Sequence, residues 1–128
     1  MKKFIVLIKK KEGMSFEAFR HHYENVHVPL CGKRIGHLIQ DFRRFYPKDL
    51  CNLYAGRADA GAGTPGGTAY DAIAVYTIKD EAAFAELIRI GQDPDFQRLI
   101  TEDEKHFCDR AATLEGGAEE CFGSGING

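Results

Sequence analysis

The spacing of apolar residues differs between segments of this chain, and each spacing predicts an element. Residues 3–9 form a short apolar run without alternation, which predicts a strand covered on both faces. Between Ser15 and Leu30, large apolar residues recur every three or four positions, which predicts an amphipathic helix capped by Ser15. Pro29 lacks the N–H that a helix interior needs, so we expect a break near residues 27–28.

The rest of the chain repeats this order of elements. Residues 39–46 and 70–78 predict two further strands, and residues 112–120 are a weaker strand candidate. Between the last two, Asp80 and Asp93 are placed to cap two helical segments, the second of which begins with proline. The order β-α-β-β-α-β predicts an α+β, ferredoxin-like fold, in which helices cover one face of an antiparallel sheet.

The length of 128 residues predicts one domain, which we place at residues 1–120. Within it, residues 55–69 are dense in glycine and alanine and predict a mobile loop, because they cannot bury enough apolar surface to become ordered. Residues 121–128 predict a flexible C-terminal tail.

The first predicted strand is apolar on both of its faces. Phe4, Val6 and Ile8 alternate with Ile5 and Leu7, and helices on one side of the sheet cover only one of these sets. Monomers rarely leave a large apolar sheet face exposed to water. We therefore expect a second copy to cover it, giving a homodimer with a closed interior.

The charge and composition of the chain limit its expected binding partners and its expected cellular compartment. The net charge of −2 argues against non-specific binding to nucleic acid or to an anionic membrane. The five apolar residues 4–8 are too few for the core of a signal peptide, and no run approaches the roughly 20 residues of a membrane span. The four cysteines include no C-x-x-C pair. We expect a cytoplasmic protein with reduced thiols.

A carboxylate stands out on the helical segment after residue 93. Apolar residues that include Phe107 define one stripe, Asp103 falls in its middle, and His106 lies at its edge. A carboxylate in that place would be desolvated and in need of a partner. Asp103 is therefore either a general acid or base lining a cavity, or a structural group that fixes the helix through a neighbouring N–H or an arginine.

His27 is the second candidate, because the expected helix break would aim it at a pocket. Its alternative role is a cation favoured by the helix C-terminus. His21 and His22 lie off the middle of the apolar stripe, which predicts solvated surface positions. Tyr46 and Tyr76 either offer phenolic donors inside the fold or pack with their hydroxyls at its rim.

Metal and nucleic-acid sites are disfavoured by the motifs. Glu24-x-x-His27 and Asp103-x-x-His106 place a carboxylate and a histidine one turn apart, but the further glutamates of a di-iron site and the spacings of a zinc site are missing. RNA-recognition modules share the predicted order of elements, yet residues 70–74 do not match the aromatic and basic pattern of their third strand.

Four segments, in their order and spacing, resemble the EthD-domain family within the dimeric α+β barrel superfamily. They are residues 9–19, 27–30, 70–74 and 103–109, within a resemblance that spans residues 3 to about 120. The resemblance implies a homodimer with a pocket between sheet and helices and without a built-in cofactor.

The resemblance also implies a broad range of possible reactions. Members of the family are associated with ether degradation and with dehydration or related steps on aromatic polyketides, and the wider superfamily includes isomerases, cyclases and cofactor-free oxygenases. We expect a cofactor-independent enzyme acting on a small apolar or aromatic compound by dehydration, decarboxylation or isomerisation. The alternatives are a cofactor-free oxygenase, a non-catalytic dimer that binds a small molecule, and a nucleic-acid binder.

Two sets of residues carry this expectation. His27 and Asp103 match the family motifs and are the expected proton-transfer groups, and face geometry adds His106. The expected substrate-binding residues are aromatic: Tyr46, Tyr76 and Phe107.

Overall fold

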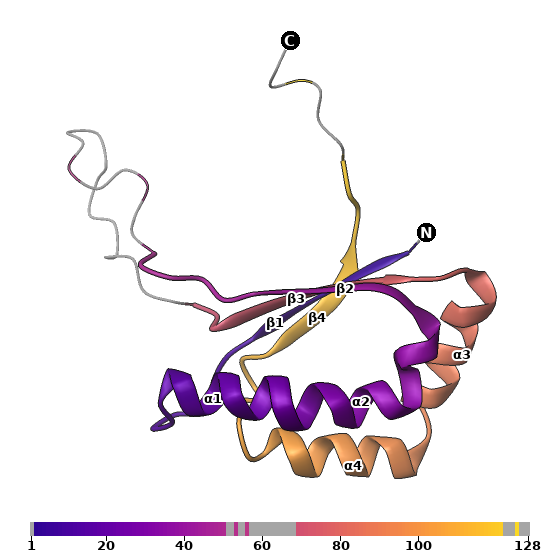
Figure 1. The fold of residues 1–128 in the computed structure, drawn as a ribbon, viewed down its shortest axis with the longest axis horizontal. Coiled ribbons are helices and arrows are strands. Elements are labelled where there is room, and N and C mark those ends of the chain that lie inside the picture. Colours follow the sequence, from indigo (N-terminus) through magenta and orange to yellow (C-terminus); the bar gives the residue numbers. More distant parts are fainter. Residues whose placement is uncertain (1, 51–52, 54–55, 57–68, 122–124, 126–128) are drawn as a thin grey trace.

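The computed structural model describes residues 2–50, 53, 56, 69–121 and 125. Four strands form one antiparallel sheet in the order β2-β3-β1-β4 (Figure 1). The strands are β1 (Lys3–Ile8), β2 (Ile39–Phe45), β3 (Ala72–Ile78) and β4 (Leu114–Ala118). This order, with helices on one side, confirms the predicted α+β ferredoxin-like fold.

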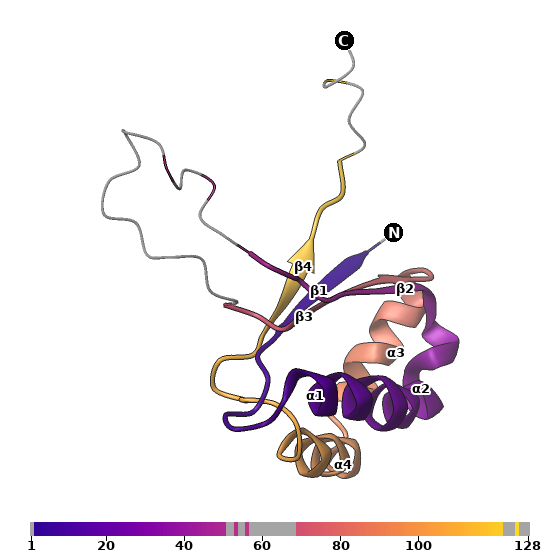
Figure 2. The same cartoon turned by 60° about the vertical axis from the view of Figure 1, so that its left-hand side comes forward.

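All helices of the described chain lie on one side of the sheet (Figure 2). They are α1 (Phe16–His22), the π-helical turn η1 (Tyr23–His27), α2 (Val28–Ile35), the 3-10 turn η2 (Gly36–Leu38), α3 (Glu81–Gly91) and α4 (Pro94–Glu104). Three of them begin at the predicted caps. Ser15, Asp80 and Asp93 each accept a backbone N–H of the first turn, at 3.1, 2.7 and 2.9 Å respectively.

The predicted helix break before Pro29 is wrong. Helix α1 continues through η1 into α2, and the chain absorbs the proline by widening one turn. The N–H of Val28 donates to the carbonyl of Tyr23, five residues earlier. This wide turn brings Pro29 into the first turn of α2, where its missing N–H costs no helical hydrogen bond.

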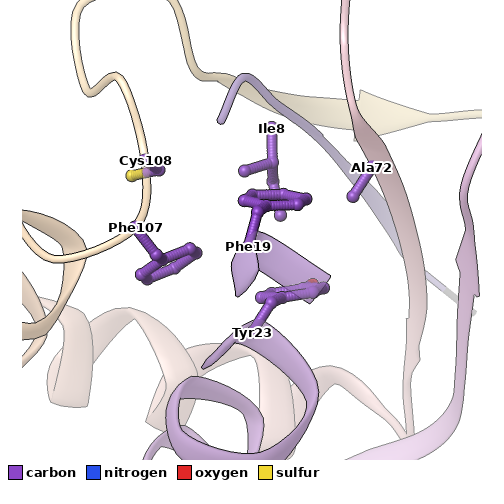
Figure 3. Close-up of a cluster of buried hydrophobic side chains, with 6 residues drawn as sticks. All are labelled: Ile8, Phe19, Tyr23, Ala72, Phe107 and Cys108. Atoms are coloured by element: carbon purple, nitrogen blue, oxygen red, sulfur yellow. The ribbon is translucent and has the colours of Figure 1, made fainter. Parts of the chain in front are cut away.

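The space between the helices and the sheet is filled by two clusters of buried side chains. One contains Ile8, Phe19, Tyr23, Ala72, Phe107 and Cys108, which come together beneath β1 and β3 (Figure 3). The other contains Leu38, Ile78, Ala83 and Ile90. The first cluster packs η1 and the segment that follows α4 against the same part of the sheet, and the candidate site lies there.

The opposite face of the sheet carries the second apolar set of β1, as the sequence predicts. Ile5 pairs with Val75, and Leu7 pairs with Ile73 on one side and with Leu114 on the other. No helix of the described chain covers this face (Figure 2). Large apolar side chains are therefore left without cover from this subunit.

Two predictions fall largely outside the described residues: the loop at residues 55–69 and the tail at residues 121–128. Among the helices that the structure does describe, none has the length and apolar character needed to cross a membrane.

Candidate active site

A cavity of about 370 Å³ lies between the sheet and the helical segment η1–α2. The sheet contributes Val6, Ile8, Ala74 and Tyr76, while the other wall includes His27 and Cys31, and Phe107 also lines the cavity. Small-molecule sites measure roughly 300–1,000 Å³ and are lined mainly by apolar groups with a few polar ones. The cavity therefore has the size and the lining of a site for a small, largely apolar compound.

At one end of the cavity, a buried carboxylate joins two histidines. Asp103 Oδ1 lies 2.9 Å from Nε2 of His22, and Asp103 Oδ2 lies 2.8 Å from Nδ1 of His27. The side chains of His22, His27 and Asp103 are 20, 13 and 10% exposed. Sequence reasoning predicted a buried Asp103 in need of a partner, and the partners are these two rings rather than an arginine or a backbone N–H.

The carboxylate fixes which nitrogen of each ring carries the proton. An ionised carboxylate only accepts hydrogen bonds, so each facing ring nitrogen must be a donor. A neutral His27 then carries its proton on Nδ1 and has a lone pair on Nε2. The free nitrogen of His27, and not that of His22, belongs to a residue that lines the cavity.

The wide turn η1 explains why both histidines reach one carboxylate. His22 and His27 are five residues apart, a spacing that a regular α-helix places on different faces, since its neighbours are three or four apart. In a π turn, the hydrogen bond spans five residues, as it does from Val28 to Tyr23. Both rings therefore face α4, where Asp103 lies one residue before the helix end.

The free nitrogen of His27 meets a thiol on the next helical turn. Cys31 Sγ lies 3.5 Å from Nε2 of His27, and both residues line the cavity. Burial, with the negative charges of Glu104 and Asp103 nearby, raises the pKa of the Cys31 thiol to about 12. At neutral pH this group is a protonated thiol that donates to His27.

Two phenols belong to the polar lining of the cavity. Tyr23 and Tyr76 both line it, and burial raises the pKa of each phenol above its usual value. Both groups therefore stay protonated at neutral pH. They are available as donors to an oxygen of a bound compound.

A second carboxylate, on η1, lies outside this cavity. Glu24 accepts two hydrogen bonds from Arg44, both at 2.7 Å, and a short one from the hydroxyl of Tyr46. These bonds from Arg44, against the opposing effect of burial, lower the pKa of Glu24. Tyr46 packs edge-on against Tyr23, at 6.5 Å between ring centroids, so this pair supports the cavity wall from behind.

Rings surround the two histidines. The centroid of the Phe107 ring lies 5.0 Å from that of His22 and 4.8 Å from that of His27. Phe107 is 1% exposed and follows the end of α4, so it belongs to both the core and the cavity. The orientation of both imidazoles is thus set by packing as well as by Asp103.

The structure brings most of the predicted site residues together. His27, Tyr76 and Phe107 line the cavity, and Asp103 contacts it through His27. Tyr46 is placed behind the wall, with its hydroxyl occupied by Glu24. His106 is exposed, with its ring 6.1 Å from that of His22. The roles expected for these residues stay predictions.

Sequence reasoning missed three residues of the site. The prediction that His22 lies on the solvated surface is wrong, because η1 turns it toward Asp103. From the sequence, Tyr23 is one of the large apolar residues of the predicted helix between Ser15 and Leu30, and Cys31 is a cysteine without a C-x-x-C partner. The single signal that could have found Cys31 is its spacing of four residues from His27.

A metal site does not emerge from the described side chains. Within that part of the chain, no group of three or more His, Cys, Asp or Glu residues is arranged to hold a metal ion. The expected absence of a cofactor stays a prediction.

The site was also compared with the models of known protein families. Residues 11–111 match the model of the EthD domain, which is well over half of the chain. This chain belongs to the EthD domain family. The matched range of this EthD chain includes both histidines, Cys31, Asp103 and Phe107, whereas Val6 and Ile8 of the cavity lining precede it. Among curated proteins, none matches the chain by sequence.

Solved structures share the fold of this EthD chain at low sequence identity. An ethyl tert-butyl ether (EthD) family protein from Bacillus halodurans is 20% identical, with a TM-score of 0.57 over 94% of this chain and 100% of that one. An EthD-like protein from Ralstonia eutropha is 18% identical, with a TM-score of 0.57 over 92 and 89%. A dimeric protein of unknown function with a ferredoxin-like fold, from Bacteroides fragilis, is 11% identical, with a TM-score of 0.54 over 93 and 95%.

Proposed function

We propose that this EthD chain is a cofactor-independent enzyme that moves a proton on a small apolar or aromatic carbonyl compound. The observation that carries the proposal is the contact of His27 with Asp103 at the end of an apolar cavity. A histidine whose other nitrogen is held by a carboxylate is the usual arrangement of a general base. The reaction classes in view are isomerisation, dehydration and decarboxylation.

In the proposed mechanism, Nε2 of His27 takes a proton from the carbon next to the carbonyl group. Asp103 keeps the other ring proton on Nδ1 and stabilises the imidazolium that forms, while His22 holds the second carboxylate oxygen. The protonated phenols of Tyr23 and Tyr76, which both line the cavity, are the proposed donors to the developing enolate oxygen. Return of the proton at another atom gives isomerisation. Dehydration follows when His27 instead gives the proton to a β-hydroxyl group, which leaves as water as the carbon–carbon double bond forms.

The expected rate acceleration has two sources, the base and the orientation of the bound compound. A positioned base contributes about 10²–10⁴-fold, and the remainder must come from holding the compound in the right orientation. Cys31 donates only a weak hydrogen bond to His27 Nε2, at 3.5 Å, which a bound compound can displace.

We also propose that two copies pair through the bare face of the sheet. The apolar residues of that face, among them Leu7, Ile73 and Val75, support it, as do relatives described as dimeric. Val75→Lys should give a monomer in sedimentation at a concentration where the unchanged chain is a dimer. Leu99→Lys, at an exposed apolar position on α4, is the control that should stay dimeric. A monomeric unchanged chain at micromolar concentration would contradict this proposal.

The function is tested with 2-tetralone, a bicyclic ketone whose protons next to the carbonyl exchange with solvent through the enolate. In D2O, the loss of their signals in the NMR spectrum measures the exchange rate. We expect the protein to accelerate exchange and His27→Gln to lower that acceleration by about 10²-fold, the lower range for a lost base. His21→Gln, at an exposed ring bonded to Asn25, is the control. Equal acceleration by the unchanged chain and by His27→Gln would overturn the proposal.

Two other outcomes correspond to the alternatives. Binding of 2-tetralone without any acceleration favours a non-catalytic small-molecule-binding protein, which the apolar lining would also serve. Oxygen consumption that depends on His27 and on an ionisable aromatic compound favours a cofactor-free oxygenase.

A further inference from the structure

Cys31 is a nucleophilic group of the site that the proposed proton transfer does not use. Its sulfur lies in the cavity lining, 3.5 Å from Nε2 of His27, and Nδ1 of the same ring lies 2.8 Å from Asp103. Thiol, imidazole and carboxylate thus follow one another in a line of hydrogen bonds. This is the order of nucleophile, base and orienting group in enzymes that form covalent intermediates.

We propose that Cys31 is a nucleophile that adds reversibly to α,β-unsaturated carbonyl compounds bound in the cavity. The inference rests on the function proposed above, because it uses the same cavity and the same base, and it narrows the substrate class to conjugated enones. Such compounds are small and apolar, and their carbonyl oxygen needs the hydrogen-bond donors that Tyr23 and Tyr76 offer.

The addition balances without any further reactant. The Cys31 sulfur forms a bond to the β-carbon as its proton passes to Nε2 of His27, and the electrons of the carbon–carbon double bond move to the carbonyl oxygen. The enolate then takes the proton from His27 at its α-carbon. The product is a saturated ketone joined to Cys31 by a thioether, and the reverse sequence restores the enone and the free thiol.

The surroundings of Cys31 make the histidine necessary for this step. Burial of the thiol, together with the negative charges of Glu104 and Asp103, raises its pKa to about 12. A thiolate is the reactive form of cysteine, and this environment does not stabilise one at rest. The proton must therefore leave to His27 as the new bond forms, and Asp103 is placed to stabilise the resulting imidazolium.

Cys108 provides a matched control within the same molecule. It lines the same cavity, and burial raises the pKa of its thiol to about 11, close to that of Cys31. Within the described part of the chain, however, no histidine is hydrogen-bonded to Cys108. If access to the cavity alone decided reactivity, the two thiols would react alike.

The test uses benzylideneacetone, an aromatic enone, followed by borohydride to reduce the carbonyl of the adduct and prevent its reversal. Trypsin cuts after lysine and arginine, so the four cysteines of the chain fall on four different peptides, and mass spectrometry reports each thiol separately. We expect the peptide of Cys31 to gain one probe molecule and that of Cys108 to stay unlabelled. Cys31→Ser should lose the cavity adduct.

Dependence on the histidine decides between base-assisted addition and simple exposure of a thiol. We expect His27→Gln and Asp103→Asn each to slow labelling of Cys31 at least tenfold, with circular dichroism showing that the variants are folded. In the unchanged chain, the labelling rate should rise with pH and level off once the imidazole is neutral, well below the thiol pKa of about 12. A rate that keeps rising toward that pH would mean that His27 takes no part.

Three results overturn the inference: no adduct on Cys31, equal labelling of Cys31 and Cys108, or labelling of Cys31 that does not change in both His27→Gln and Asp103→Asn. The proposed function is judged separately, because 2-tetralone has no conjugated double bond for a thiol to attack. Proton exchange that depends on His27, without any adduct on Cys31, would remove this inference and leave the proposed function in place.

Discussion

Two carboxylates project from neighbouring helical segments, and their partners give them different properties. Glu24 is held by Arg44 and Tyr46, and its side chain is 25% exposed. Asp103 is held by His22 and His27, and its side chain is 10% exposed. An arginine keeps its charge at every accessible pH, whereas a histidine can gain or lose a proton near neutrality.

The difference separates a structural pair from a reactive one. Arg44 lowers the pKa of Glu24, so that carboxylate stays ionised and ties β2 to η1. The Asp103 cluster ends instead on an imidazole nitrogen in the cavity, where a proton can be exchanged with a bound compound. The partner of a buried carboxylate, an arginine or a histidine, therefore indicates better than its burial whether the carboxylate takes part in a reaction.

The largest expected effect comes from replacing each carboxylate by its amide. Asp103→Asn should lower the 2-tetralone exchange rate by about 10²-fold or more, because an amide can donate to His27 Nδ1 and so move the ring proton to Nε2, where the base is needed. Glu24→Gln, the matched change outside the cavity, should leave most of the rate. Similar losses in both variants would mean that the two carboxylates do not differ in function.

Removing the second histidine should have a smaller effect. His22→Leu leaves one oxygen of Asp103 without its partner and should lower the exchange rate about tenfold, since a hydrogen bond to a charged group contributes roughly 1.5–3 kcal/mol. His22→Gln retains an N–H donor and should restore part of the rate. A positioning role also predicts that the pH profile of the rate shifts in His22→Leu, whereas a purely structural role predicts an unchanged profile with less folded protein.

The Glu24 cluster should matter for stability in acid. Its folded pKa lies below the ordinary value of 4.5, so its contribution to folding is present above that pH and is lost as the pH falls through the folded pKa. Because the pair is partly exposed, Glu24→Gln should cost only about 1 kcal/mol at neutral pH in urea unfolding. Below pH 4.5, the variant and the unchanged chain should converge. A constant difference across this range would contradict the assignment.

The smallest effect is expected at His106. Its exposed ring lies beside His22 but outside the lining of the cavity, so His106→Gln should change the exchange rate much less than His27→Gln. A loss comparable to that of His27→Gln would restore His106 as a proton-transfer group and place the reaction nearer to the protein surface.

Local patterns were sufficient to predict the elements of this fold. The apolar run of β1 and the caps at Ser15 and Asp80 depend on residues close in sequence, and the structure confirms them. The burial of Asp103 followed equally from its place on an apolar stripe. These features require no knowledge of what lies across the molecule.

Which residues meet at the site depends on one irregular helical turn and on contacts between residues that are far apart in the sequence. A helical period of three to four residues separates His22 from His27, and only the widened turn at η1 brings them onto one face. Tyr46 was expected in the cavity, but its hydroxyl reaches Glu24, 22 residues away along the chain. Neither fact can be obtained from periodicity, because each is set by packing between segments.

The ring of Phe107, stacked on His22 and close to His27, has a consequence for rate as well as for stability. When a catalytic base must first rotate into place, this reorganisation adds to the activation free energy of the reaction. Here the imidazoles are already clamped between an aromatic ring and a carboxylate before any compound enters, so preorganisation of the base is a by-product of folding the core.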